Sequence, residues 1–175
     1  MRSEALRDIQ APLKARYRED PEAAVVTLAA DGSVEGEGVT CSVQTGRALV
    51  EAGLHPATGG DGLSVCSGDL LLEALVACAG VTLRAVATAL DIPIRSGRVH
   101  AEGDIDFRGT LGVDRDAPVG FRAIRLTFTL DTDVDEDTLD KLLQLTERYC
   151  VVHQTLASRP ALSMELERSA PPPTG

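Results

Sequence analysis

Residues 67–90 read SGDLLLEALVACAGVTLRAVATAL, a segment rich in leucine, alanine and valine. It predicts one long helix from about Gly68 to Leu90, which ends at the turn signal of residues 91–93. Ser67 is placed as the N-cap, and Asp69 adds a favourable negative charge to the first turn. Apolar side chains surround most of the cylinder, which is typical of a helix that is buried on nearly all sides.

The sequence on both sides of this helix predicts one α+β domain with mostly antiparallel sheets. Strands are expected over residues 23–30, 34–44, 48–52, 98–108, 121–129 and 161–167. Further helices are expected from about residue 133, with Asp133 and Glu136 as a capping box, and over residues 151–158. We assign residues 1–22 to an N-terminal helical arm, 23–168 to the domain and 169–175 to a disordered tail.

The breadth of the apolar surface on the long helix also predicts an oligomer. One sheet of this size covers only part of a helix that is apolar nearly all round. Leaving several leucines in water would be strongly unfavourable, because burial of one such side chain contributes about 1.5–3 kcal/mol. We therefore expect a second subunit to cover the rest, in a homodimer.

The composition excludes several classes of protein. The 27 acidic residues outnumber the 17 basic ones, and the resulting net charge of −10 repels phosphate backbones, so no nucleic-acid partner is expected. The longest strongly apolar run, residues 74–83, is too short to span a bilayer, and Glu73 and Arg84 flank it. The chain does not open with a signal-peptide pattern. We expect a cytoplasmic protein without a membrane partner.

The candidates for chemistry are four cysteines, Cys41, Cys66, Cys78 and Cys150. No CxxC pair occurs among them, so neither a structural zinc site nor another cofactor is expected. In a reducing cytosol the simplest interpretation of each is a small buried apolar residue. Two of them have distinctive surroundings, because Cys78 follows LLLEALVA in the long helix and Cys150 lies within ERYCVVHQTL between two helical segments.

These two surroundings resemble the OsmC/Ohr family of small cysteine-dependent proteins. Members of that family carry an alanine- and leucine-rich helix ending in Ala-Cys, and then a second cysteine in a Cys-Pro-Val-x-x-x-Leu-like stretch. The order of elements and the GGDG loop of residues 59–62 match its OsmC-like branch. The resemblance extends over roughly residues 23–167.

The resemblance implies an OsmC-like fold, with antiparallel sheets around a long buried central helix, in an intertwined homodimer with active sites at the interface. It also implies a thiol peroxidase that acts on organic hydroperoxides. Cys78 would attack the peroxide as a thiolate and become a sulfenic acid, which Cys150 would capture as a disulfide. A dithiol reductant, of lipoyl type in the best-known members, would restore both thiols.

Such a reaction requires a depressed pKa at Cys78, although apolar surroundings raise the pKa of a thiol. In the best-characterised members an arginine and the glutamate of an Asn-Pro-Glu motif activate the cysteine, and the glutamate position corresponds here to Gly68. Asp69 is the nearest acid, and Arg47 is the only arginine within residues 23–67, so both are candidate site residues. The alternatives are a helix-end charge for Asp69 and an exposed strand-end charge for Arg47. We expect a slow peroxidase whose activity rises between about pH 7 and 9.

Two other functions stay open. The chain could be a non-catalytic OsmC-like dimer that binds an apolar ligand, or a redox sensor whose disulfide changes a partner contact. The missing glutamate and the Cys150-Val151 departure from Cys-Pro favour the binding protein. His153, three residues after Cys150, is interpreted either as a group that bonds or deprotonates that thiol or as an ordinary core or surface histidine. Cys41 and Cys66 are interpreted as structural, although Cys66 stands beside the helix start.

Overall fold

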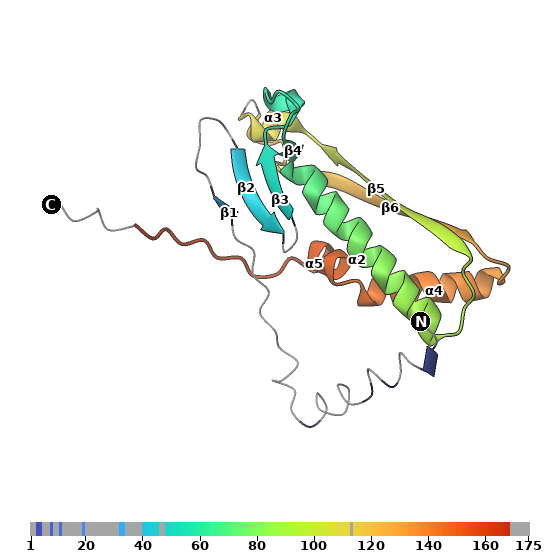
Figure 1. The fold of residues 1–175 in the computed structure, drawn as a ribbon. Coiled ribbons are helices and arrows are strands. Elements are labelled where there is room, and N and C mark those ends of the chain that lie inside the picture. Colours follow the sequence, from blue (N-terminus) through green and yellow to red (C-terminus); the bar gives the residue numbers. More distant parts are fainter. Residues whose placement is uncertain are drawn as a thin grey trace.

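The computed structural model describes residues 48–112 and 114–168, and residues 32–33 and 40–45 of the N-terminal part (Figure 1). The predicted strand over residues 23–30, Arg47 and the predicted tail over residues 169–175 lie outside the described residues. The predicted arm over residues 1–22 is described only at positions 3, 4, 8, 11 and 19.

The long helix predicted from the sequence is α2, Ser67–Ala89. Its N-cap is Cys66 and not Ser67, because the backbone is still extended at Cys66 (φ −70°, ψ 135°) and Ser67 is already helical. Asp69 lies in the first turn, as expected. The helix ends at Leu90, and Asp91 turns the chain away with a φ of 55°.

A two-stranded antiparallel sheet covers one side of this helix, formed by β5 (Ser96–Ile105) and β6 (Phe121–Asp131). Both strands were predicted, whereas the short helix α3 (Phe107–Thr110) in their connection was not. Val99 lies opposite Phe128 and Ala101 opposite Leu126, so the face toward α2 is apolar. The alternation of the sequence thus determines which face of the hairpin packs.

Charged residues occupy the other face of the hairpin. Arg125 contacts Glu102 at 2.6 Å and Asp104 at 2.6 Å. All three side chains are largely exposed, so the pairs contribute little to stability and mainly keep this face in solvent.

Helices α4 (Glu136–Tyr149) and α5 (Val151–Ser158) follow one another with only Cys150 between them. The predicted capping box of Asp133 and Glu136 is wrong, because Asp135 caps α4 by accepting a hydrogen bond from the Thr138 N–H at 2.8 Å. Asp133 instead forms an ion pair with Arg95. The chain turns sharply at this one-residue junction, and Cys150 packs against Leu75 and Ala79 of α2.

A second sheet lies beside the start of α2 (Figure 1), with the strand order β1-β2-β3-β4. Its strands are Gly32–Ser33, Thr40–Thr45, Ala48–Gly53 and Val65–Cys66. β2 and β3 pair antiparallel, as predicted, whereas β1 pairs antiparallel with β2 at residues 32–33, where no strand was predicted. β4 pairs parallel with β3, and its two residues are too short a segment for a sequence pattern to predict. The glycine-rich loop before β4 contains the short helix η2, Pro56–Thr58. Gly60 in this loop cannot carry a side chain, because a Cβ there would lie 1.8 Å from the Leu54 carbonyl oxygen.

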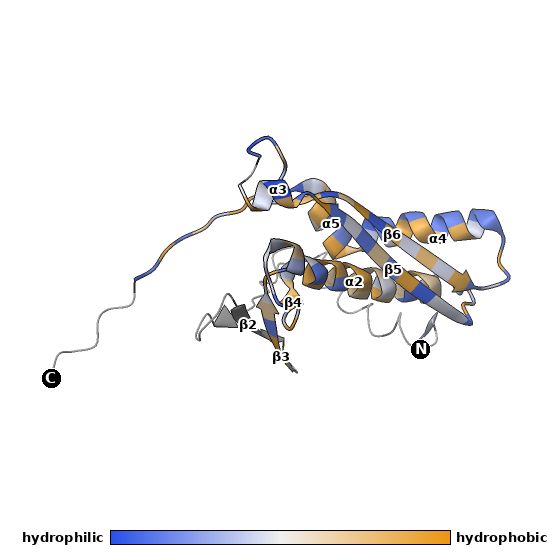
Figure 2. Ribbon diagram, turned by 90° about the horizontal axis from the view of Figure 1, so that it is seen from above, coloured by the Kyte–Doolittle hydropathy of each residue, from blue (hydrophilic) through white to orange (hydrophobic). Residues whose placement is uncertain are grey.

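The core follows one face of α2, where Leu75, Ala79, Leu83 and Ala87 are spaced four residues apart and buried. The β5–β6 hairpin, α4 and α5 cover this face. In Figure 2 most of α2 has the hydrophobic colour, and the two colours alternate along β5 and β6. On the opposite side of α2, Val81 is 72% exposed. The expected burial on nearly all sides is therefore confirmed for one face only.

The predicted closing strand over residues 161–167 is wrong for the single chain, since residues 159–168 form no helix or strand. Three apolar side chains that alternate along this segment are almost fully exposed: Leu162 (91%), Met164 (98%) and Leu166 (87%). A strand needs a neighbouring strand for its backbone hydrogen bonds. The described part of the chain places no such strand beside residues 161–167. By length and composition α2 would also suit a membrane span, a test that core helices of soluble proteins pass as well.

Candidate active site

Cys78 and Cys150 come from different helices and meet in the core. Cys78 lies in the middle of α2 and is half-buried, whereas Cys150 is 1% exposed at the junction of α4 and α5. Both belong to the cluster around Leu75 and Ala79, and both are free thiols. The structure therefore brings together the two cysteines that the sequence singled out, although 72 positions separate them along the chain (150 − 78).

The sulfur of Cys78 lies at the first turn of α5. Burial acts to raise the pKa of the Cys78 thiol, but hydrogen bonds from the Val152 N–H, the Cys150 thiol and the Val151 N–H outweigh it and lower the pKa below 9.0. The first N–H groups of a helix have no partner within that helix. The Cys78 sulfur accepts from these N–H groups of α5, where the helix dipole also favours a negative charge.

The pKa of Cys150 moves in the opposite direction. Burial raises it, and the neighbouring Cys78 raises it further, because Cys150 donates a hydrogen bond to the Cys78 sulfur and a second thiolate there would be repelled. The N–H groups of His153 and Val152 act to lower the pKa of Cys150, but they do not outweigh these two effects. The pair therefore holds one proton on Cys150 and favours the thiolate at Cys78.

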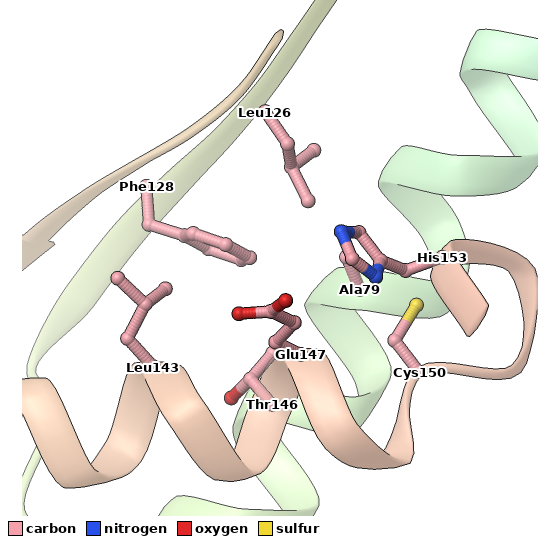
Figure 3. A pocket seen from close by; sticks show the side chains of 8 residues that line it. All are labelled: Ala79, Leu126, Phe128, Leu143, Thr146, Glu147, Cys150 and His153. Atoms are coloured by element: carbon pink, nitrogen blue, oxygen red, sulfur yellow. The ribbon is translucent and has the colours of Figure 1, made fainter. Parts of the chain in front are cut away.

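A small pocket of about 180 Å³ reaches Cys150 on the side of α4 and β6 (Figure 3). Its walls are mostly apolar, with Leu126, Phe128 and Leu143 on one side. Glu147 and His153 also line it, and the Nδ1 atom of His153 is buried without a hydrogen-bond partner among the described residues. The His153 ring is thus the polar side chain that lies beside the sulfur of Cys150 (Figure 3).

Asp69 does not lie at this pair within one chain. It lines another pocket, of about 360 Å³, together with Cys66, His55 and Asp104 at the start of α2. Nine residues of helix separate it from Cys78, which is about 13.5 Å along the axis. Gly68, where the family's glutamate would fall, is one residue further away, and Arg47 is outside the described residues. Any contact of Asp69 with Cys78 would have to come from another chain.

Sequence reasoning missed two features of the site. The N–H groups of Val151 and Val152 carry no side-chain signature, so only the one-residue junction between two helical patterns could have indicated them. Glu147 was not singled out, although it lies one helical turn before Cys150. Among the described residues no group of three or more histidine, cysteine or acidic side chains is arranged to hold a metal ion.

Comparisons with known structures show the same fold. An OsmC-like protein from Mycoplasma pneumoniae is 19% identical, with a TM-score of 0.62 over 77% of this chain and 91% of that chain. An organic hydroperoxide resistance protein OsmC from Legionella pneumophila is 14% identical, with a TM-score of 0.60 over 77% of this chain and 93% of that chain. An organic hydroperoxide resistance protein from Elizabethkingia anophelis is 15% identical, with a TM-score of 0.62 over 78% of this chain and 91% of that chain.

A search of the curated proteins found no match. The sequence profile of the family described as OsmC-like protein matches residues 59–165, which include α2, the β5–β6 hairpin, α4, α5 and both cysteines of the pair. Proteins of this family are soluble, which fits α2 as a core helix. The match extends over more than half of the chain, and the chain therefore belongs to the OsmC-like protein family.

Proposed function

We propose that this protein is a cysteine-based peroxidase that reduces organic hydroperoxides, with Cys78 as the nucleophile and Cys150 as the resolving cysteine. The observation that carries the proposal is the pair itself, in which the pKa of Cys78 is lowered at the first turn of α5 while Cys150 keeps its proton. A thiolate is the reactive form toward peroxides, and a second thiol in contact with it is what a two-cysteine cycle needs.

The reaction runs in two steps. The Cys78 thiolate attacks the terminal oxygen of the hydroperoxide, the O–O bond breaks, and the alkoxide leaves and takes up a proton. Cys78 is then a sulfenic acid. The sulfur of Cys150 attacks it, a disulfide forms, and hydroxide leaves with the proton of Cys150 as water.

The remaining parts of the proposal rest on the family and on the exposed surface. Two structural relatives are titled organic hydroperoxide resistance proteins, which supports the substrate class. A dithiol reductant of lipoyl type, a homodimer and a cytoplasmic location belong to the same proposal. The exposed apolar side of α2 and the unpaired segment over residues 159–168 support the dimer.

The test is consumption of a bulky organic hydroperoxide by the reduced protein, followed by disulfide mapping without reduction. We expect one Cys78–Cys150 disulfide per chain and no turnover in Cys78→Ser. Cys66→Ser is the matched control, because it removes a half-buried thiol outside the pair. Full turnover in Cys78→Ser, or a disulfide between Cys78 and Cys66 alone, would contradict the proposal.

The apolar pocket beside Cys150 favours one second candidate, a dimer that binds an apolar ligand and uses its cysteines for packing. Packing cysteines react slowly with alkylating agents until the protein unfolds. Equal and slow alkylation of Cys78 and Cys150 in the native protein would favour this candidate over the peroxidase.

A further inference from the structure

The pocket at Cys150 has a feature that the oxidation steps do not use. Buried polar atoms are hydrogen-bonded in more than about nine cases of ten, yet the buried Nδ1 atom of His153 has no partner among the described residues. The ring lies beside Cys150, at the edge of a space that is otherwise walled by leucine and phenylalanine (Figure 3). A free ring nitrogen in such a place suits a proton donor or acceptor that is present only in part of the cycle.

We propose that this pocket admits the reducing thiol, that the thiol attacks Cys150 and not Cys78, and that His153 takes its proton. The inference rests on the proposed function, because it concerns the return of the Cys78–Cys150 disulfide to two thiols. Its basis is that the pocket reaches Cys150 and His153 together, whereas Cys78 is not among the lining residues.

The unequal pKa values of the two cysteines also favour attack of the thiol on Cys150. In thiol–disulfide exchange the thiol with the lower pKa leaves faster. Attack on Cys150 expels Cys78, whose thiolate the N–H groups of Val151 and Val152 stabilise. Attack on Cys78 would instead expel Cys150, whose pKa is raised by burial and by its neighbour.

The step balances as follows. The first thiol gives its proton to His153, its sulfur bonds to Cys150, and the S–S bond breaks with its electron pair on Cys78. A second thiol then attacks the first thiol's sulfur, its proton passes to solvent, and the oxidised reductant leaves as a disulfide. Cys150 departs as a thiolate and recovers the proton that His153 holds.

The charged and titratable groups that face His153 are Glu147 from α4, Cys150 from the junction and, beyond it, Cys78 from α2. The pocket residues from β6, Leu126 and Phe128, are uncharged. The Nδ1 atom of His153 forms no hydrogen bond with Glu147 or with any other described residue. Apolar walls with Glu147 as the one acidic side chain favour an uncharged, apolar thiol over an anionic one.

The first experiment tests which cysteine the thiol attacks, and it uses no peroxide. The disulfide is formed with diamide, a small amount of 2-mercaptoethanol is added, acid stops the reaction, and the mixed disulfide is mapped by mass spectrometry. We expect the mixed disulfide on Cys150 to exceed the one on Cys78 roughly tenfold. An adduct mainly on Cys78, or equally on both, overturns the inference and leaves the peroxidase proposal intact. Failure of diamide to form the disulfide overturns both the inference and the role of Cys150.

His153→Gln tests the proton acceptor. We expect reduction of the Cys78–Cys150 disulfide by 2-mercaptoethanol in this variant to slow by roughly a hundredfold at neutral pH. The difference in reduction rate between this variant and the wild type should become smaller as the pH rises, because 2-mercaptoethanol that is already ionised needs no base. His100→Gln is the control, since His100 is exposed on β5. If the reduction rate falls by the same factor at every pH, or does not fall, His153 is not the proton acceptor.

Discussion

The thiol of Cys150 donates a hydrogen bond to the sulfur of Cys78, and the pKa values of the two residues move apart. The contact stabilises the Cys78 thiolate and discourages a second thiolate at Cys150. Before any peroxide binds, Cys78 is therefore the residue favoured as a thiolate, and Cys150 is the residue favoured as a thiol.

Removing the donor at Cys150 should raise the pKa of Cys78. Loss of one hydrogen bond to a charged group corresponds to about one pKa unit. In the wild type, the rate of Cys78 alkylation by iodoacetamide should reach half its maximum below pH 9.0, because the pKa is lowered from that value. Cys150→Ala should shift this midpoint upward, and Cys150→Ser should shift it less, because a hydroxyl still donates. Identical midpoints in all three proteins would contradict the hydrogen bond.

This pH dependence also revises an expectation from the sequence. The missing glutamate at Gly68 suggested a weakly stabilised thiolate, with activity still rising up to about pH 9. The first turn of α5 supplies stabilisation instead, so the rise should level off at a lower pH than the missing glutamate suggested. A sequence pattern could not reveal this, because the backbone N–H groups of Val151 and Val152 would be present with almost any side chains.

Local periodicity explains what the sequence did predict. The apolar run of α2, the alternation in β5 and β6 and the helix after Cys150 depend on neighbours in the chain, and all of them are present. The segment over residues 161–167 alternates in the same way, but a strand also requires a pairing partner, and alternation does not provide one. The N-cap of α4 was missed for a related reason, since Asp133 forms an ion pair with Arg95, which directly precedes β5.

Cys150 should protect Cys78 from irreversible oxidation. Without a resolving thiol the sulfenic acid persists and reacts with further peroxide to a sulfinic acid. We expect Cys150→Ser, treated with excess hydroperoxide, to gain the mass of two oxygen atoms on the peptide that contains Cys78. The wild type should show the disulfide at the same peroxide concentration. Protection of Cys78 in Cys150→Ser would mean that another thiol resolves it.

The exposed side of α2 should form the subunit interface. Val81 is 72% exposed on this helix, and burying a valine contributes about 1.5 kcal/mol or more. A lysine there places a charge in an apolar contact, so Val81→Lys should be monomeric in light scattering at micromolar concentration. Val119→Lys is the matched control, because Val119 is 65% exposed in the loop before β6. A monomeric wild type would contradict the homodimer.

The contact between α2 and α4 should dominate the stability of the domain. Leu142 is 1% exposed and packs with Leu83 and Ala87. Leu142→Ala should lower the free energy of unfolding by about 3–5 kcal/mol, because a cavity remains where the side chain was. Leu63→Ala, at an 89% exposed position, should change it by less than about 0.5 kcal/mol. Chemical denaturation of both variants measures the difference.

Asp69 provides the last prediction, because its two possible roles give different results. As a charge in the first turn of α2 it interacts with the helix dipole, so Asp69→Asn should cost about 0.3–1 kcal/mol of stability at low salt. An activating carboxylate would also lower the pKa of Cys78, but the two residues are about 13.5 Å apart along one helix.

We therefore expect Asp69→Asn to leave the alkylation midpoint of Cys78 unchanged. An upward shift would assign Asp69 to the active site of another subunit, since its own Cys78 is out of reach. That shift should then disappear when Asp69→Asn is combined with Val81→Lys, because a monomer cannot supply the second chain. A shift that persists in the monomeric double variant would show that the separation along α2 does not limit the contact.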